Sequence, residues 1–123
     1  MILQASKFNR YLVGMTIFFA TTASAMEVSQ YRKLRTAESR TDSAGILRIY
    51  IRGLQDGIEW SNAFLTQDGR TKIYCLPRNL SLNTDNYMQF IDEAVDQKRN
   101  PEIKGTEQIE LHLLLQLQQK FPC

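Results

Sequence analysis

The sequence predicts an all-α protein: a small single-domain helical bundle of about four to five helices, clipped by one disulfide bond. Three observations predict this class. Apolar residues recur at three- and four-residue steps through most of the chain after residue 25, there are only two cysteines, Cys75 and Cys123, and residues 1–25 have the character of a secretory signal. The periodicity indicates the helices, and export indicates an oxidising compartment in which two thiols pair.

The N-terminal segment has the three parts of a signal peptide. Lys7 and Arg10 supply the positive charge, an apolar run of roughly 10 residues follows, and Ala23-Ser24-Ala25 is a small-x-small cleavage site. The alternative is a membrane anchor, but a spanning helix needs roughly 20 apolar residues. We therefore expect cleavage before Met26 and a soluble, exported protein.

Removal of the signal changes the charge of the protein. The whole chain has 15 basic and 13 acidic residues, and the signal contains two of the basic ones and none of the acidic ones, which leaves 13 against 13. Binding to nucleic acid or to an anionic membrane loses its main electrostatic argument. We interpret the short basic cluster of Arg32, Lys33 and Arg35 as a solvated helix face. Removing 25 of the 123 residues leaves 98, enough for one domain, residues 26–123, with a thin core.

Two helices are predicted in the first half of this domain. The first is a short amphipathic stretch, roughly Val28 to Ala37. The second is a long central helix that Asp42 or Ser43 can cap and that ends before Asp68-Gly69. We expect its buried stripe to consist of the apolar and small residues that recur at helical spacing: Ile46, Ile49, Tyr50, Gly53, Leu54, Gly57, Trp60 and Phe64.

Gly53 and Gly57 lie one turn apart on that stripe. Because a glycine inside a helix costs about 1 kcal/mol relative to alanine, close approach of another helix is the expected compensation. We therefore expect a tight helix-helix contact at these residues, within the core or across a dimer.

A third helix is predicted after Pro77. Residues 80–85 offer several N-cap candidates, and Asn100-Pro101 stops the helix. Its apolar residues are expected to be Tyr87, Met88, Ile91, Ala94 and Val95.

The last helix is predicted to start at a Thr106 cap and to end near Lys120. Glu107 and Glu110 then lie in its first turn, where the helix dipole favours negative charge. The leucines of this segment also alternate as in a strand, but Leu, Gln, Glu and Lys dominate it and its length exceeds a typical strand, so we favour a helix.

The two cysteines are expected to form a disulfide. Closing a loop of nearly fifty residues stabilises the fold by about 4 kcal/mol in the chain-entropy model. A Cys75/His112 nucleophile pair is the alternative, but a disulfide sulfur is not a thiolate. A zinc site of Cys75, Cys123 and His112 lacks a close-spaced ligand pair, and His112 is better interpreted as a helix residue near the rim of the core.

Other catalytic groups are equally weak candidates. Asp92, Glu93 and Asp96 are carboxylates on a polar helix face, for which solvation is the ordinary explanation. No glycine-rich phosphate loop is present in the sequence. We therefore expect a binding protein rather than an enzyme, with no metal and no cofactor.

Several short motifs, in this order, resemble the type VI secretion amidase-immunity family (Tai, or Rap1a/Tai). They are the helix segment Tyr50-Ile51-Arg52-Gly53-Leu54-Gln55-Asp56-Gly57, the turn Tyr74-Cys75-Leu76-Pro77, the Asn100-Pro101 break between two helices, and the ending Phe121-Pro122-Cys123. The likeness covers about Val28 to the C-terminus.

This resemblance implies a compact, all-helical periplasmic immunity protein, often a homodimer. Such proteins protect a bacterium from a peptidoglycan amidase that sibling or competing cells inject. The related effectors look like papain-type Cys/His enzymes, whose active site the immunity protein occludes. Two other functions remain open: a periplasmic acid-stress chaperone, and an envelope-interaction protein with no toxin partner.

An inhibitor of this kind needs a rigid scaffold and a protruding polar segment. The best candidate is the charged segment Gln97 to Gly105, stiffened by Pro101 and carrying one exposed-looking apolar residue, Ile103. The expected partner-binding residues are Lys98, Arg99, Asn100, Glu102, Ile103 and Lys104. An ordinary helix connection is the alternative interpretation. The second choice is Thr66 to Lys72, a glycine turn flanked by charges.

Overall fold

A computed structural model of the chain describes residues 25–38 and 44–123, and in these residues the protein is all-α. Four helices follow one another: α1 (Val28–Glu38), α2 (Ala44–Gln67), α3 (Thr84–Ala94) and α4 (Ile109–Lys120). The described residues thus confirm the helical bundle predicted from periodicity. The predicted signal, except for Ala25, and the predicted cap at Asp42 or Ser43 lie outside them.

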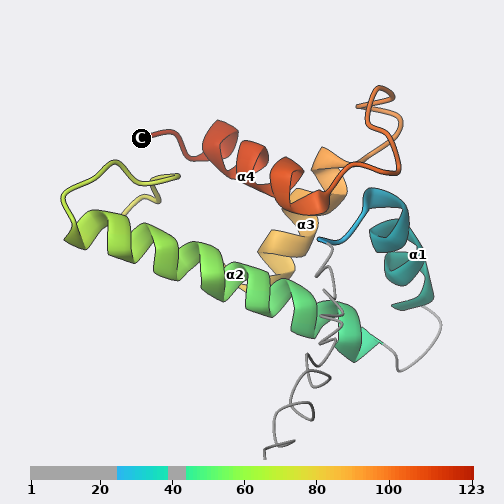
Figure 1. Cartoon of the computed structure of the whole chain (residues 1–123), viewed down its shortest axis with the longest axis horizontal. Helices are drawn as coiled ribbons and strands as arrows, with labels where there is room; N and C mark the ends of the chain where they lie inside the picture. The colour runs from blue at the N-terminus through green and yellow to red at the C-terminus, as the bar shows by residue number, and fades with distance from the viewer. Residues whose placement is uncertain (1–24, 39–43) are drawn as a thin grey trace, which may run out of the picture.

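The helices differ greatly in length, and the longest organises the others. Figure 1 shows α2 along the whole length of the molecule, α3 behind it and below α4, and α1 at the end where α2 begins. The packed pairs are α1 with α2, α2 with α3, and α3 with α4. The α3–α4 loop, which we define as residues 95–108, projects beyond the helices next to α1 (Figure 1).

All four helices contribute to one core. From α2 the core receives Leu47, Ile51 and Ile58, which recur at steps of four and seven. From α4 it receives Ile109, Leu113 and Leu117, each fully buried. The intervening Leu111 and Leu115 are each 53% exposed. The leucines of this segment are therefore sorted by the helical period, and the prediction of a helix over a strand is confirmed.

Two helix boundaries differ from the prediction. α3 ends at Ala94, and the chain turns through residues 95–99 well before the predicted stop at Asn100-Pro101. α4 begins at Ile109 with Gln108 as its N-cap residue, because residues 107 and 108 pair with the segment before α1 and Thr106 is left in a turn. At the start of α3, by contrast, Asn83 and Asn86 form a reciprocal capping box.

Cys75 and Cys123 form a disulfide, as predicted, across a sequence separation of 48 residues. It joins the turn after α2 to the end of α4. The Cys75 amide also donates to the Phe121 carbonyl at 2.9 Å, and the Tyr74 and Phe121 rings pack with their centroids 6.4 Å apart. The Cys-x-Pro and Phe-Pro-Cys motifs are thus one structural unit.

In the part of the chain that the structure describes, no helix has the length and apolar character of a membrane span.

Candidate partner-binding surfaces

The α3–α4 loop is held firmly at its first turn. Asn100 donates from Nδ2 to the carbonyls of Glu93, at 3.4 Å, and Ala94, at 3.0 Å, and from its backbone to the Asp96 carbonyl at 2.8 Å. These bonds satisfy carbonyls that the end of α3 leaves without intrahelical partners. Asn100, predicted to contact a partner, is therefore a half-buried internal support of the loop.

The other end of the loop is bonded to the start of α1. The Gly105 carbonyl accepts from the Ser29 amide at 2.9 Å, and the Glu107 carbonyl accepts from the Val28 amide at 2.8 Å. A Cβ atom added to Gly105 would lie 3.2 Å from the Ser29 Cβ, so the two backbones approach more closely than most side chains allow. The loop is therefore fixed at both ends.

Between these supports the loop presents charged side chains to solvent. Four of the predicted partner-binding residues are exposed: Lys98, Arg99, Glu102 and Lys104. Ile103 is not exposed, although its position in a polar segment suggests that it would be. It is half-buried and packs against the core. The exposed part of the predicted site is thus polar and carries three positive charges and one negative.

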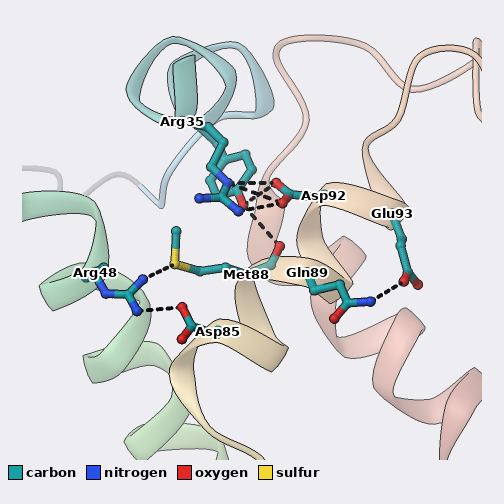
Figure 2. A network of polar contacts seen from close by, with 8 residues as sticks. Arg35, Arg48, Asp85, Met88, Gln89, Asp92 and Glu93 are labelled. Carbon is teal, nitrogen blue, oxygen red and sulfur yellow. Dashed lines mark hydrogen bonds and ion pairs between the residues drawn. The ribbon is translucent and has the colours of Figure 1, made fainter. Parts of the chain in front are cut away.

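A polar network between α1 and α3 supports the base of this loop (Figure 2). Arg35 donates to Asp92 from Nε, at 3.2 and 3.3 Å, and from Nη2 at 2.9 Å. The buried Tyr31 hydroxyl donates to Asp92 Oδ1 at 2.7 Å and approaches the Met88 carbonyl at 3.2 Å. A second pair nearby, Arg48 with Asp85, joins α2 to α3 (Figure 2).

The basic cluster on α1 is therefore not simply the solvated helix face that the sequence suggests. Arg35 is paired with Asp92, and Arg32 donates from Nη2 to the Val95 carbonyl just beyond α3. Only Lys33 of the three is exposed to solvent. These contacts have no local signal in the sequence, because the acceptors lie more than 50 residues away, on α3 and just beyond it.

The carboxylates of α3 and the following turn are each engaged by a basic group. Asp92 accepts from Arg35, Glu93 accepts from Lys120 at 2.9 Å, and Asp96 lies 3.9 Å from Arg99. Lys120 also lies 5.1 Å from the centre of the Phe90 ring. The hydrogen bond from Lys120 lowers the pKa of Glu93. Asp92 and Glu93 thus connect α3 to α1 and α4, and Asp96 pairs within the α3–α4 loop.

The outward side of α2 carries a second apolar stripe, which we call the outer face. It exposes Ile46 (68%), Ile49 (73%), Trp60 (76%) and Phe64 (64%), in one line at helical spacing. Gly53 and Gly57 lie between the two pairs, and a Cβ atom added to either would meet nothing within 4 Å. Because exposed apolar residues in a contiguous strip often mark interaction sites, the outer face is a candidate binding surface.

This finding corrects the prediction for α2. The predicted buried stripe is the exposed one, and the residues that enter the core are Leu47, Ile51 and Ile58. Tyr50 and Leu54 are half-buried at the boundary between the two faces. The expected tight contact at Gly53 and Gly57 is absent within the described residues.

The second-choice loop, residues 66–72, is exposed along its whole length. Gly69 has φ of 68°, a left-handed conformation that favours glycine. Asn62 fixes the return of the chain, since its side chain accepts from the Ile73 amide at 2.7 Å and donates to the Tyr74 carbonyl at 2.9 Å. This loop adjoins the Phe64 end of the outer face and lies at the opposite end of the molecule from the α3–α4 loop (Figure 1).

The remaining residues considered for catalysis or metal binding are Cys75, Cys123 and His112. Cys75 and Cys123 are bonded to each other, so neither is a thiolate nor a zinc ligand. The His112 side chain is 12% exposed, and its Nε2 lies 3.8 Å from Glu107 Oε1. Among the described residues no group of three His, Cys, Asp or Glu side chains could hold a metal ion.

Comparisons with known protein families, curated proteins and solved structures found no match to this chain.

The outer face was not predicted from the sequence, although one signal could have indicated it. α2 contains two apolar stripes, and one helix in a thin bundle can bury only one of them in its own core.

Proposed function

We propose that this protein is a periplasmic immunity protein that binds a type VI secreted peptidoglycan amidase and occludes its active site. The observation that carries the proposal is the α3–α4 loop, which projects from the bundle and is bonded at both ends to other elements. The resemblance of the Cys-x-Pro and Phe-Pro-Cys motifs to the amidase-immunity family supplies the class of partner. The structure adds that these two motifs join in one unit through the disulfide.

A fixed loop is well suited to inhibition by occlusion. Binding requires ordering of the contact residues, and a loop that is already ordered loses little conformational entropy. Its exposed side chains, Lys98, Arg99, Glu102 and Lys104, are long and polar and can reach into a narrow cleft. Their excess of positive charge favours a cleft that carries negative charge.

The proposal includes a homodimer formed through the outer face of α2. This face is complementary to itself when two copies pack antiparallel about a two-fold axis near Gln55. Ile49 then lies against Trp60 of the second copy and Ile46 against Phe64, while Gly53 and Gly57 meet at the centre, where their lack of side chains permits close approach.

Charge follows the same symmetry. Arg52 and Asp56 flank the apolar stripe and form an exposed pair, 3.5 Å apart, within one helix. In the antiparallel arrangement Arg52 of one copy lies near Asp56 of the other. The stripe from Ile46 to Phe64 is about 27 Å long at the rise of an α-helix. The α3–α4 loop projects next to α1 and does not arise from α2, so we expect both loops of a dimer to stay accessible (Figure 1).

The experiment is co-expression with the cognate amidase in the periplasm, with lysis as the readout. Wild-type protein should prevent lysis, and a triple variant, Lys98→Ala, Arg99→Ala and Glu102→Ala, should not. The complex should weaken by at least about 2 kcal/mol if these residues are the anchors. Ile103 is left unchanged because it packs against the core.

The matched control removes charges from the other loop by Arg70→Ala and Lys72→Ala, which should leave protection intact. If this control abolishes protection and the triple variant does not, residues 66–72 form the plug. If wild-type protein binds no amidase, the immunity function is wrong. Suppression of aggregation of acid-unfolded periplasmic proteins would then favour the chaperone function.

A further inference from the structure

The backbone nitrogen of Met26, the second described residue, lies in an unusual polar arrangement. The Met26 backbone nitrogen lies 3.0 Å from Glu110 Oε1 and 3.2 Å from the Tyr50 hydroxyl oxygen, and Tyr50 donates to the same Glu110 oxygen. The other carboxylate oxygen, Glu110 Oε2, is buried and has no hydrogen-bond partner in the described structure. One backbone N–H therefore faces a carboxylate that can accept further hydrogen bonds.

Met26 is held in this place by its neighbours. The Ile109 amide donates to the Met26 carbonyl at 3.0 Å, and Glu27 and Gln108 form an antiparallel bridge. The Met26 side chain is only 7% exposed and belongs to the core. The nitrogen is thus fixed against Glu110 by bonds on its C-terminal side.

The charge of Glu110 has no cationic partner among the described ion pairs. Glu110 lies in the first turn of α4, near the positive end of the helix dipole. Burial and the hydrogen bond to Glu110 raise the pKa of Tyr50, so its hydroxyl stays protonated and remains a donor. A buried carboxylate oxygen without a partner is costly, which indicates that a donor is missing.

We propose that Glu110 is the binding site for the α-ammonium group that cleavage of the signal peptide creates on Met26. Hydrolysis of the Ala25–Met26 bond consumes one water molecule: Ala25 leaves as a carboxylate, and the Met26 nitrogen takes up protons to become an ammonium. This group has three N–H donors and a positive charge. Two acceptors lie within 3.2 Å of the Met26 nitrogen, Glu110 Oε1 and the Tyr50 hydroxyl oxygen, and the unpartnered Glu110 Oε2 belongs to the same carboxylate.

The proposal rests on cleavage before Met26, and it does not depend on an amidase partner. Its consequence is that export and folding are coupled. The precursor presents a neutral amide to Glu110, whereas the mature protein presents a cation at the same atom. The contact is part-buried, and such an ion pair stabilises a fold when its geometry is good and its remaining hydrogen bonds are satisfied. The mature form is therefore the more stable one.

The experiment compares two N-termini in two backgrounds. The protein is secreted with its own signal, and N-terminal sequencing of the mature form should find Met26 first. A matched variant carries one Ser inserted after Ala25, so that cleavage leaves Ser before Met26 and the ammonium moves one residue away. In the wild-type background the insertion should lower the melting temperature by at least about 5 °C.

In a Glu110→Gln background the same insertion should have little effect, because the carboxylate that distinguishes the two N-termini is gone. Equal losses in both backgrounds, or no loss in wild type, would overturn the proposal. A mature protein that begins at another residue would overturn it as well.

A second readout covers the case in which Glu110→Gln does not fold. In wild-type protein the α-amine should react with an amine-selective reagent at least about tenfold more slowly than in the Ser-inserted protein, in which the amine is outside the site. Tyr50→Phe should increase that rate in the wild-type N-terminus. Equal reactivity of the two N-termini would show that the ammonium is not held by Glu110.

Discussion

The two faces of α2 differ more in environment than in composition. The inner face places Leu47, Ile51 and Ile58 in the core, and the outer face exposes Ile49 and Trp60 to solvent. Both faces are apolar and both follow the helical period. The difference shows that periodicity identifies an amphipathic helix but not which of two apolar stripes the chain itself buries. The second stripe is then available for another molecule, in our proposal a second copy of the protein.

The largest expected difference between the faces is in folding stability. Ile51→Ala should reduce the free energy of unfolding by about 2–5 kcal/mol, because Ile51 is fully buried and its removal leaves a cavity. Ile49→Ala should change it by less than about 0.5 kcal/mol in the monomer, because Ile49 is 73% exposed. Urea denaturation at low protein concentration measures both. Equal losses would mean that the two faces are not distinct.

Substitution of a glycine on the outer face should have a smaller effect on the free energy of unfolding, and of opposite sign. Gly53→Ala should stabilise the monomer by up to about 1 kcal/mol, because alanine is the better helix former and the space above Gly53 is open. Gly53→Leu should fold equally well but separate two antiparallel copies. Thermal unfolding at low concentration tests the first expectation. A marked loss of stability in the alanine variant would show that Gly53 contacts another part of its own chain.

The smallest expected effect is on the pH dependence of stability. It concerns two ion pairs, one between α3 and α4 and one within α2. Glu93 has a lowered pKa because of Lys120, so the pair adds stability above the ordinary range of a carboxyl pKa and loses it as the pH falls through the folded-state value. Lys120→Met should therefore weaken the pH dependence of unfolding between about pH 3 and 5. Arg52→Met, which removes the exposed partner of Asp56, is the control and should leave that dependence nearly unchanged. Identical profiles for the two variants would contradict the assignment.

The sequence was sufficient for the helices and the disulfide, because these follow from local periodicity and from the expected pairing of the only two cysteines. It was insufficient for features that depend on distant residues. Ile103 looks exposed within a polar segment, yet the loop folds it against the core. Arg35 looks solvated, yet Asp92 on α3 accepts its hydrogen bonds. The contact of the Met26 nitrogen with Glu110 spans 84 residues and has no sequence signature.

The most direct test of the outer face as an interface between two copies is sedimentation velocity of the mature protein over a range of concentrations. Wild-type protein should sediment as a dimer at micromolar concentration. The double variant Ile49→Glu and Trp60→Glu should sediment as a monomer with an unchanged helical circular-dichroism spectrum, because both side chains are exposed in the monomer. A wild-type protein that stays monomeric at every concentration, or a double variant that still dimerises, would contradict the account.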